Sequence, residues 1–178
     1  IDGEAGTTGL EIRERLAAEP AVKVASIAAE RRKDPDARRE LMAEADLVVL
    51  CLPDAAAIEA VALADTLGNR APRIVEASTA HRVAAGWAYG FPELDASQAD
   101  AIRTAQRVAN PGCYPTGAIA LLRPLVDAGL LTPDHPVTVN AVSGYSGGGK
   151  SMIESYEVAR TAPAFELYAL GLAHKHVP

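Results

Sequence analysis

A glycine-rich turn near the start of the chain restricts its folding options more than any other feature. The stretch "GEAGTTG" places Gly3, Gly6 and Gly9 three residues apart, between a short strand-like start and the helix-like run "LEIRERLAAE". Glycines at this spacing let a strand turn tightly into a helix, whose free N–H groups can then bind a pyrophosphate. The turn predicts a dinucleotide-binding unit, with a purely structural turn as the alternative.

Strand-like and helix-like runs alternate after this turn. Short β-branched runs at "VKVASI", "LVVLCLP", "RIVEAS" and "QRVANPGC" are expected strands, and "DAAAIEAVALADTLG" is an expected helix that ends at Gly68. The stretch "ERRKDPDARRE" is expected to be a charged connection broken by proline. This alternation predicts an α/β domain over residues 1–112, with a Rossmann-type, doubly wound parallel sheet.

The pattern changes after about residue 112. The run "PTGAIALLRPLVDAGLL" predicts a helix that Pro124 should kink or break. The run "HPVTVNAVSGYS" alternates apolar and polar residues, as half-solvated strands do. We expect residues 113–178 to begin a second, α+β domain for substrate and catalysis, here incomplete. The shortened first strand and the end directly after "HKHVP" suggest part of a longer protein.

Charge near the end of the second expected strand bears on the choice of dinucleotide. Glu30 is followed by Arg31, Arg32 and Lys33. An acidic residue at this distance from the glycines suits NAD, whereas arginine suits the 2′-phosphate of NADP. The cations favour NADP, although a solvated charged loop is the alternative. The predicted cofactor contacts are Gly3, Ala5, Gly6, Thr7, Thr8, Gly9, Arg31, Arg32, Leu52, Pro53 and Ser78.

The two cysteines have different settings. Cys113 follows "NPG" at the end of an expected strand and the start of an expected helix. A helix N-terminus stabilises a thiolate and supplies N–H donors for an oxyanion, so Cys113 is the predicted nucleophile. Cys51 lies within the apolar strand "LVVLCLP", where a buried, inert thiol is expected.

A thiol nucleophile needs an acid/base partner, and four histidines are available. His81 follows a strand near the expected cofactor cleft, and His135 is expected in a surface turn. His174 and His176, in "AHKHVP", are the preferred pair, with no choice between them. No cluster with metal-ligand spacing accompanies them, so no metal site is predicted.

The stretch "GYSGGGKS" matches the phosphate-loop pattern G-x-x-x-x-G-K-[ST] at Gly144–Ser151. A nucleotide-hydrolysing loop of this kind normally opens its own sheet and needs a metal-binding aspartate on a later strand. No apolar run followed by Asp comes after Lys150. We therefore expect backbone contacts to an anion here, without ATP or GTP hydrolysis.

Composition narrows the possible partners. The 178 residues carry a net charge of −6, which argues against general nucleic-acid binding. No apolar run approaches the roughly 18 residues that span a bilayer, so no membrane partner is expected. Two cysteines are too few for a disulfide framework, which favours a cytoplasmic location.

The dinucleotide loop, "NPGCYPTG", "SGYSGGGK" and "HKHVP", in this order, resemble the N-acetyl-γ-glutamyl-phosphate reductases. The start "GEAGTTGLEI" and "ASTAHR" are similar to the shorter, type 2 variant of that family. The resemblance implies NADPH-dependent reduction of an acyl phosphate to N-acetylglutamate 5-semialdehyde in arginine biosynthesis, by a homo-oligomer. It also implies that Cys113 forms a thioester and that His174 or His176 is the acid/base. The substrate contacts that it implies are Asn110, Ser143, Gly144, Ser146, Gly147 and Lys150.

Two further functions remain open at this point. The related aspartate-semialdehyde dehydrogenases share the architecture but typically lack the Gly-Cys-Tyr-Pro-Thr continuation. A binding module for NADP without chemistry, in which Cys113 only begins a helix, belongs to a different class.

Overall fold

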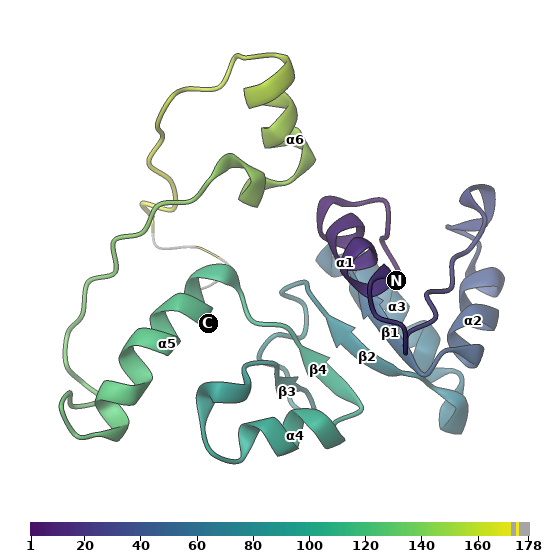
Figure 1. The fold of residues 1–178 in the computed structure, drawn as a ribbon, viewed down its shortest axis with the longest axis horizontal. Coiled ribbons are helices and arrows are strands. Elements are labelled where there is room, and N and C mark those ends of the chain that lie inside the picture. Colours follow the sequence, from purple (N-terminus) through teal and green to yellow (C-terminus); the bar gives the residue numbers. More distant parts are fainter. Residues whose placement is uncertain (172–173, 175–178) are drawn as a thin grey trace. The chain divides into compact units, whose positions relative to one another are not determined.

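A parallel β-sheet forms the centre of the first part of the chain (Figure 1). The computed structural model describes residues 1–171 and residue 174. The strands β1 (Leu47–Leu50), β2 (Arg73–Glu76), β3 (Ala88–Tyr89) and β4 (Arg107–Ala109) lie in the order β1-β2-β4-β3. Every pair is parallel, and Asp2 adds a parallel bridge to Leu50 of β1. The predicted α/β class with a parallel sheet is confirmed.

Four α-helices accompany the sheet within the described part of this unit, and small side chains let one of them pack closely. They are α1 (Thr7–Ala17), α2 (Pro35–Glu44), α3 (Asp54–Asp65) and α4 (Gln98–Thr104). Ala57, Ala60 and Ala64 of α3 are fully buried, and the last two join Leu50 and Ile74 of the sheet in one apolar cluster. The sheet and the Ala-rich face of α3 therefore supply much of the core.

Helix α2 replaces the irregular connection that the charged stretch predicts. Asp34 caps it, because its Oδ1 accepts from the N–H groups of Asp36 (3.0 Å) and Ala37 (3.3 Å). Pro35 occupies the first helical position, where its missing N–H costs nothing. The proline thus begins a helix here, and the prediction of a loop was wrong.

The expected strand "VKVASI" is also absent, since residues 22–28 have no regular secondary structure. A strand in a parallel sheet needs a neighbour for its backbone hydrogen bonds. At the edge of β1 that faces away from β2, the described residues provide only the single bridge between Asp2 and Leu50.

The chain consists of two compact units, Ile1–Pro111 and Gly112–Pro178. The second contains α5 (Cys113–Asp127), a 3₁₀ turn (Tyr145–Gly148), α6 (Lys150–Ile153) and a π turn (Glu154–Val158). Beyond Gly112, none of the described residues is buried. The assignment of residues 113–178 to a substrate domain of a longer protein stays a prediction.

The structure differs from two expectations for this second unit. Pro124 does not break α5, which continues to Asp127, because a proline so close to the C-terminus removes only one helical hydrogen bond. The stretch at residues 135–146, expected to be a half-solvated strand, has no regular structure up to residue 144 and then enters the 3₁₀ turn. No strand of the described part of this unit is available to pair with them.

Candidate cofactor and catalytic sites

The glycine turn closes tightly on itself and on the end of β1. Gly3 has a φ of +87°, and a Cβ there would clash with the carbonyl oxygen of Cys51. A Cβ at Gly9 would clash with the carbonyl oxygen of Gly3 and lie 2.7 Å from Cα of Glu4. Gly6 precedes α1 and gives no side-chain cap, so the first turn of the helix keeps its N–H groups open for an anion.

The loops that follow β1, β2 and β4 are hydrogen-bonded to one another. Thr79, after β2, donates from its N–H and its hydroxyl to the Asp54 carboxylate at the start of α3 (2.9 and 2.6 Å). Arg82 donates to the carbonyls of Ala77, Ser78 and Asn110 (3.0, 2.9 and 3.1 Å). Since ligands of open parallel sheets bind at the carboxyl ends of the strands, this edge is the candidate cofactor site.

A buried carboxylate organises the loop after β2. Glu76 is fully buried, and it accepts hydrogen bonds from the N–H (3.0 Å) and the hydroxyl of Ser78. Its second oxygen lies 2.8 Å from Nδ1 of His81, whose ring stacks on Trp87 at 4.5 Å between centroids. The geometry gives His81 a structural partner inside this loop, and it fixes the position of the predicted cofactor contact Ser78.

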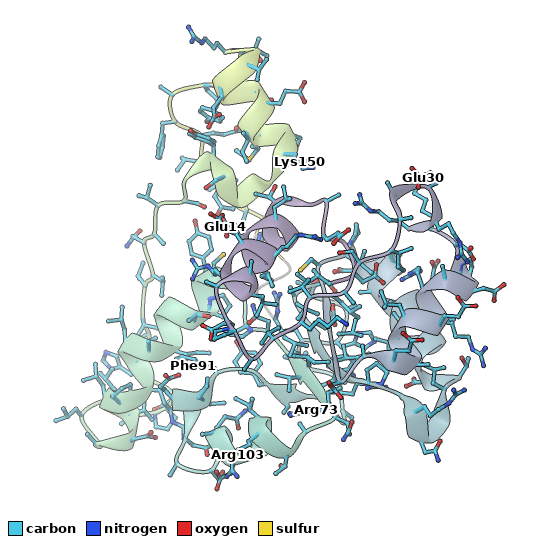
Figure 2. All side chains as sticks on the ribbon, turned by 45° about the vertical axis from the view of Figure 1, so that its right-hand side comes forward. Glu14, Glu30, Arg73, Phe91, Arg103 and Lys150 are labelled. Atoms are coloured by element: carbon cyan, nitrogen blue, oxygen red, sulfur yellow. The ribbon has the colours of Figure 1, made fainter. Side chains whose placement is uncertain are left out.

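The two predicted arginines have different partners. Arg31 donates from Nε and Nη2 to the Asp34 carboxylate (3.0 and 2.9 Å), which raises the pKa of Arg31 and lowers that of Asp34. Arg32 pairs with Glu4 of the glycine turn at 3.0 Å. Glu30 is exposed on the loop that carries both (Figure 2). Of the two arginines predicted to contact the cofactor, only Arg32 is thus paired with the predicted dinucleotide loop.

Cys113 is exposed and begins α5. Gly112 gives the helix no side-chain cap, and Thr116 bonds back to the Gly112 carbonyl through its N–H (3.0 Å) and its hydroxyl (2.8 Å). A largely apolar pocket of about 620 Å³ lies beside the thiol, and Ser143 also lines it. The structure therefore brings the predicted nucleophile and one predicted substrate contact to the same pocket.

A pair of tyrosines connects this helix to the end of the described chain. The hydroxyl of Tyr168 donates to that of Tyr114 at 2.6 Å, and this bond is the main reason that the pKa of Tyr168 is raised. The Tyr168 ring also meets that of His174 edge to face, at 6.1 Å between centroids. Because His174 reaches α5 through Tyr168, it fits the predicted acid/base role better than His135. His176 lies outside the described residues.

All but one of the remaining predicted substrate contacts follow Ser143 along the chain. Gly144, Ser146 and Gly147 lie in or beside the 3₁₀ turn, and Lys150 begins α6 (Figure 2). A Cβ on Gly147 would lie 3.0 Å from Oγ of Ser143, so the turn packs against that side chain. Asn110 belongs to the other unit, where its N–H donates to the Glu76 carbonyl at 2.8 Å.

Several polar side chains at these sites were missed by the sequence reasoning. Tyr114 stands inside the quoted motif "NPGCYPTG", and Arg82 inside "ASTAHR", yet neither received a role. One terminal nitrogen of Arg82, Nη1, is buried without a hydrogen-bond partner among the described residues. Arg13 lies one helical turn after Gly9, a spacing that could have placed it on the same face as the glycine turn.

The described residues contain no metal site and no membrane span. They hold no group of three or more His, Cys, Asp or Glu arranged to bind a metal ion. No helix among them is long and apolar enough to cross a bilayer.

Comparison with known proteins gives full-length matches to this chain. It is 59% identical over 179 residues to the N-acetyl-gamma-glutamyl-phosphate reductase of Chelativorans sp. (strain BNC1), and 58% identical over 180 residues to that of Mesorhizobium japonicum. It is 54% identical to N-acetyl-gamma-glutamyl-phosphate reductase 2 of Pseudomonas putida. Each match covers 100% of this chain but only 56–57% of the relative. The chain thus spans a little over half the length of these relatives.

Two other comparisons concern parts of the chain. Residues 113–178 match the family described as semialdehyde dehydrogenase, dimerisation domain. The crystal structure of aspartate semialdehyde dehydrogenase II from Vibrio cholerae aligns with 71% of this chain and 37% of its own, at 15% identity and a TM-score of 0.48.

Proposed function

We propose that this chain is part of an N-acetyl-gamma-glutamyl-phosphate reductase, because it is 59% and 58% identical over its whole length to two proteins of that name. It is an enzyme that reduces N-acetyl-γ-glutamyl phosphate to N-acetylglutamate 5-semialdehyde in arginine biosynthesis, with NADPH as the reductant. The observation that carries the proposal is an exposed thiol at an uncapped helix N-terminus, beside a pocket, in a chain with a dinucleotide-type glycine turn. We further propose a cytoplasmic homo-oligomer that assembles through the domain to which residues 113–178 contribute.

The residues of the glycine turn fit a dinucleotide. Gly6 adds no side chain in front of α1, and a Cβ there would meet only the Gly3 carbonyl oxygen, at 3.3 Å. The N–H groups of Thr7, Thr8 and Gly9 would hold the pyrophosphate, with Leu52, Pro53 and Ser78 contributing from the neighbouring loops. Bound there, the cofactor supplies the hydride that reduces the acyl group.

The chain's own residues perform the covalent part of the reaction. The Cys113 thiolate attacks the acyl carbon, the C–O bond to phosphate breaks, and phosphate leaves with the bonding electrons, so a thioester forms. The N–H groups at the start of α5 stabilise the oxyanion of the tetrahedral state, since Gly112 provides no competing cap. Once the thioester is reduced, His174 or His176 would protonate the oxygen of the thiohemiacetal on Cys113 and take that proton back as the C–S bond breaks, so that the aldehyde leaves and the Cys113 thiolate re-forms. Asn110, Ser143, Gly144, Ser146, Gly147 and Lys150 would bind the substrate.

The experiment that tests this function uses the intact protein and the reverse reaction. N-acetylglutamate 5-semialdehyde and phosphate are supplied with NADP, and NADPH formation is followed by absorbance. We expect Cys113→Ser to lower the rate by about a thousandfold or more, because the thioester can no longer form. The matched control is Cys51→Ser, which removes the half-buried thiol and should leave the rate within about twofold.

Two results would contradict the proposal. Equal turnover of aspartate semialdehyde would favour the related dehydrogenase. An intact protein that binds NADP but converts neither aldehyde, with or without Cys113, would favour a binding module.

A further inference from the structure

The side chains of Asp54 and Thr79 join two loops at the carboxyl edge of the sheet. Asp54 is the first residue of α3, and its two carboxylate oxygens accept from the N–H (2.9 Å) and the hydroxyl (2.6 Å) of Thr79. The two residues directly before Asp54, Leu52 and Pro53, are predicted cofactor contacts. Ser78, directly before Thr79, is another. The pair therefore connects the two segments that carry these predicted contacts.

The loop after β2 is held in place by its own contacts. Glu76 is fully buried, accepts from the N–H and the hydroxyl of Ser78, and lies 2.8 Å from Nδ1 of His81. Arg82 donates to the Ser78 carbonyl at 2.9 Å and to the Asn110 carbonyl at 3.1 Å. Because these bonds fix the backbone around Ser78, this loop can serve as an anchor for its neighbour.

The segment between β1 and α3 has fewer contacts of its own. The backbone of Leu52 makes no hydrogen bond to another described residue, and Pro53 has no N–H to donate. The next residue, Asp54, makes both of its bonds to Thr79 across the gap in sequence. These two bonds therefore hold the segment against the anchored loop.

The exposure of the pair separates a positioning role from a stabilising one. Asp54 is exposed and Thr79 is half-buried. Substitutions at exposed positions usually change the free energy of unfolding very little. A ligand that needs one loop conformation, however, binds more weakly in proportion to how seldom that conformation is populated. Loss of the pair should thus affect ligand binding more than folding.

We propose that Asp54 and Thr79 are positioning residues that hold Leu52 and Pro53 in the conformation that binds the dinucleotide. The proposal rests on the proposed function, because it takes NADP as the ligand of this edge. The pair acts through the loop and not by direct contact, since the Asp54 carboxylate would repel the phosphates of the cofactor.

Titration calorimetry of the intact protein with NADP tests the proposal without any need for turnover. Thr79→Val keeps the shape of the side chain but removes the hydroxyl bond, so it should weaken NADP binding about fivefold. Thr79→Ser keeps the hydroxyl and should bind within about twofold of the wild type. Thr66→Val is the matched control, because it removes an exposed hydroxyl bond, to the Leu63 carbonyl, at the other end of α3. It should leave NADP binding unchanged.

A double-mutant cycle shows whether the two residues act through the same contact. Asp54→Ala removes both bonds and should weaken NADP binding at least as much as Thr79→Val. The variant that carries both changes should bind no more weakly than Asp54→Ala alone. A purely structural role would lower stability instead, whereas we expect the melting temperature of Thr79→Val to stay within about 2 °C of the wild type.

Steady-state kinetics of the reverse reaction adds a second readout. Thr79→Val should raise the KM for NADP and leave kcat unchanged, because only ground-state binding of the cofactor is lost.

The other outcomes separate this inference from the proposed function. Losses that add in the double variant, or an equal loss in Thr66→Val, would overturn the positioning role. If all variants bind NADP like the wild type, the positioning role fails while dinucleotide binding stands. If the wild type does not bind NADP, the proposed reductant is wrong and the inference fails with it.

Discussion

Cys51 and Cys113 differ in solvent exposure, and this difference should change how fast each thiol reacts with an alkylating reagent. Cys113 is exposed at the first residue of α5, whereas Cys51 is half-buried after β1, and burial raises the pKa of the Cys51 thiol. A raised pKa leaves a smaller fraction of Cys51 as the reactive thiolate at neutral pH.

We therefore expect iodoacetamide to label Cys113 at least about tenfold faster than Cys51 near neutral pH. The difference should narrow as the pH rises towards the raised pKa of Cys51. Peptide mass spectrometry of timed samples at two pH values measures both rates. The Cys113→Ser variant should lose only the fast label, and equal rates in the wild type at neutral pH would contradict the prediction.

Gly9 offers a second test at the residue scale. A Cβ there would clash with the Gly3 carbonyl oxygen, and this backbone contact cannot move without opening the turn. Gly9→Ala should lower the free energy of unfolding by about 1–3 kcal/mol, the usual range for overpacking. Urea unfolding measures the loss. Gly6→Ala is the control from the same turn, since its Cβ would meet one atom, at 3.3 Å, and its effect should be much smaller.

Residue types that carry strong chemistry were identifiable from the sequence, whereas their partners were not. The exposed thiol at the start of a helix followed from "NPGC" and the run after it. The pairing of Arg32 with Glu4, and of Arg31 with Asp34, depends on how the loop folds back over the glycine turn. Two adjacent arginines look alike in sequence and differ only in three dimensions.

At the scale of elements, Asp34 decides whether the charged stretch after Lys33 becomes helix α2. Its carboxylate accepts two backbone N–H groups of the first turn and pairs with Arg31. Asp34→Ala should lower the melting temperature by a few degrees, and Asp34→Asn should have a smaller effect because the amide oxygen still caps the helix. Circular dichroism during heating compares the variants.

The same cap gives the helix a pH dependence. The bond to Arg31 and the two backbone donors lower the pKa of Asp34, so its contribution is complete above the ordinary aspartate pKa. It is lost as the pH falls through the lowered value. The melting-temperature difference between wild type and Asp34→Ala should therefore be constant near neutral pH and shrink in acid. A difference that grows in acid would contradict this mechanism.

The elements that the sequence predicted correctly are those whose local sequence and pairing partners both favour them. Helix α3 begins after Pro53 and is rich in alanine, and β1 and β2 are short β-branched runs that pair with each other. The two expected strands that are absent, at residues 22–27 and 135–146, have the right composition but no neighbour in the described structure. Composition can favour a strand, but the strand forms only where a neighbouring strand can take up its backbone hydrogen bonds.

At the scale of the whole chain, the two units differ in how much they bury. All of the core residues belong to Ile1–Pro111, and no described residue after Gly112 is buried. Local stability follows buried apolar contacts, so the units should open with different free energies.

We expect hydrogen exchange of this chain to show slow amides in β1, β2 and β4 and fast amides in α5, by at least about a hundredfold. Mass spectrometry of peptides from both units measures the contrast. In a protein as long as these relatives, the corresponding α5 peptides should exchange more slowly if further chain covers them. Uniform protection across this chain would contradict the prediction.

The glycine turn has a consequence for how such sequences diverge. The turn itself requires Gly3 and Gly9, because any side chain at either position would collide with backbone whether or not a ligand is present. A descendant that had lost its cofactor could therefore keep both glycines as long as it kept its fold. At Gly6 the requirement is weaker, because a Cβ there would lie 3.3 Å from the Gly3 carbonyl oxygen, a tight contact but not a clash. If the turn binds the proposed dinucleotide, distant homologues in which only Gly6 is replaced would be those that kept the architecture but no longer bind the dinucleotide.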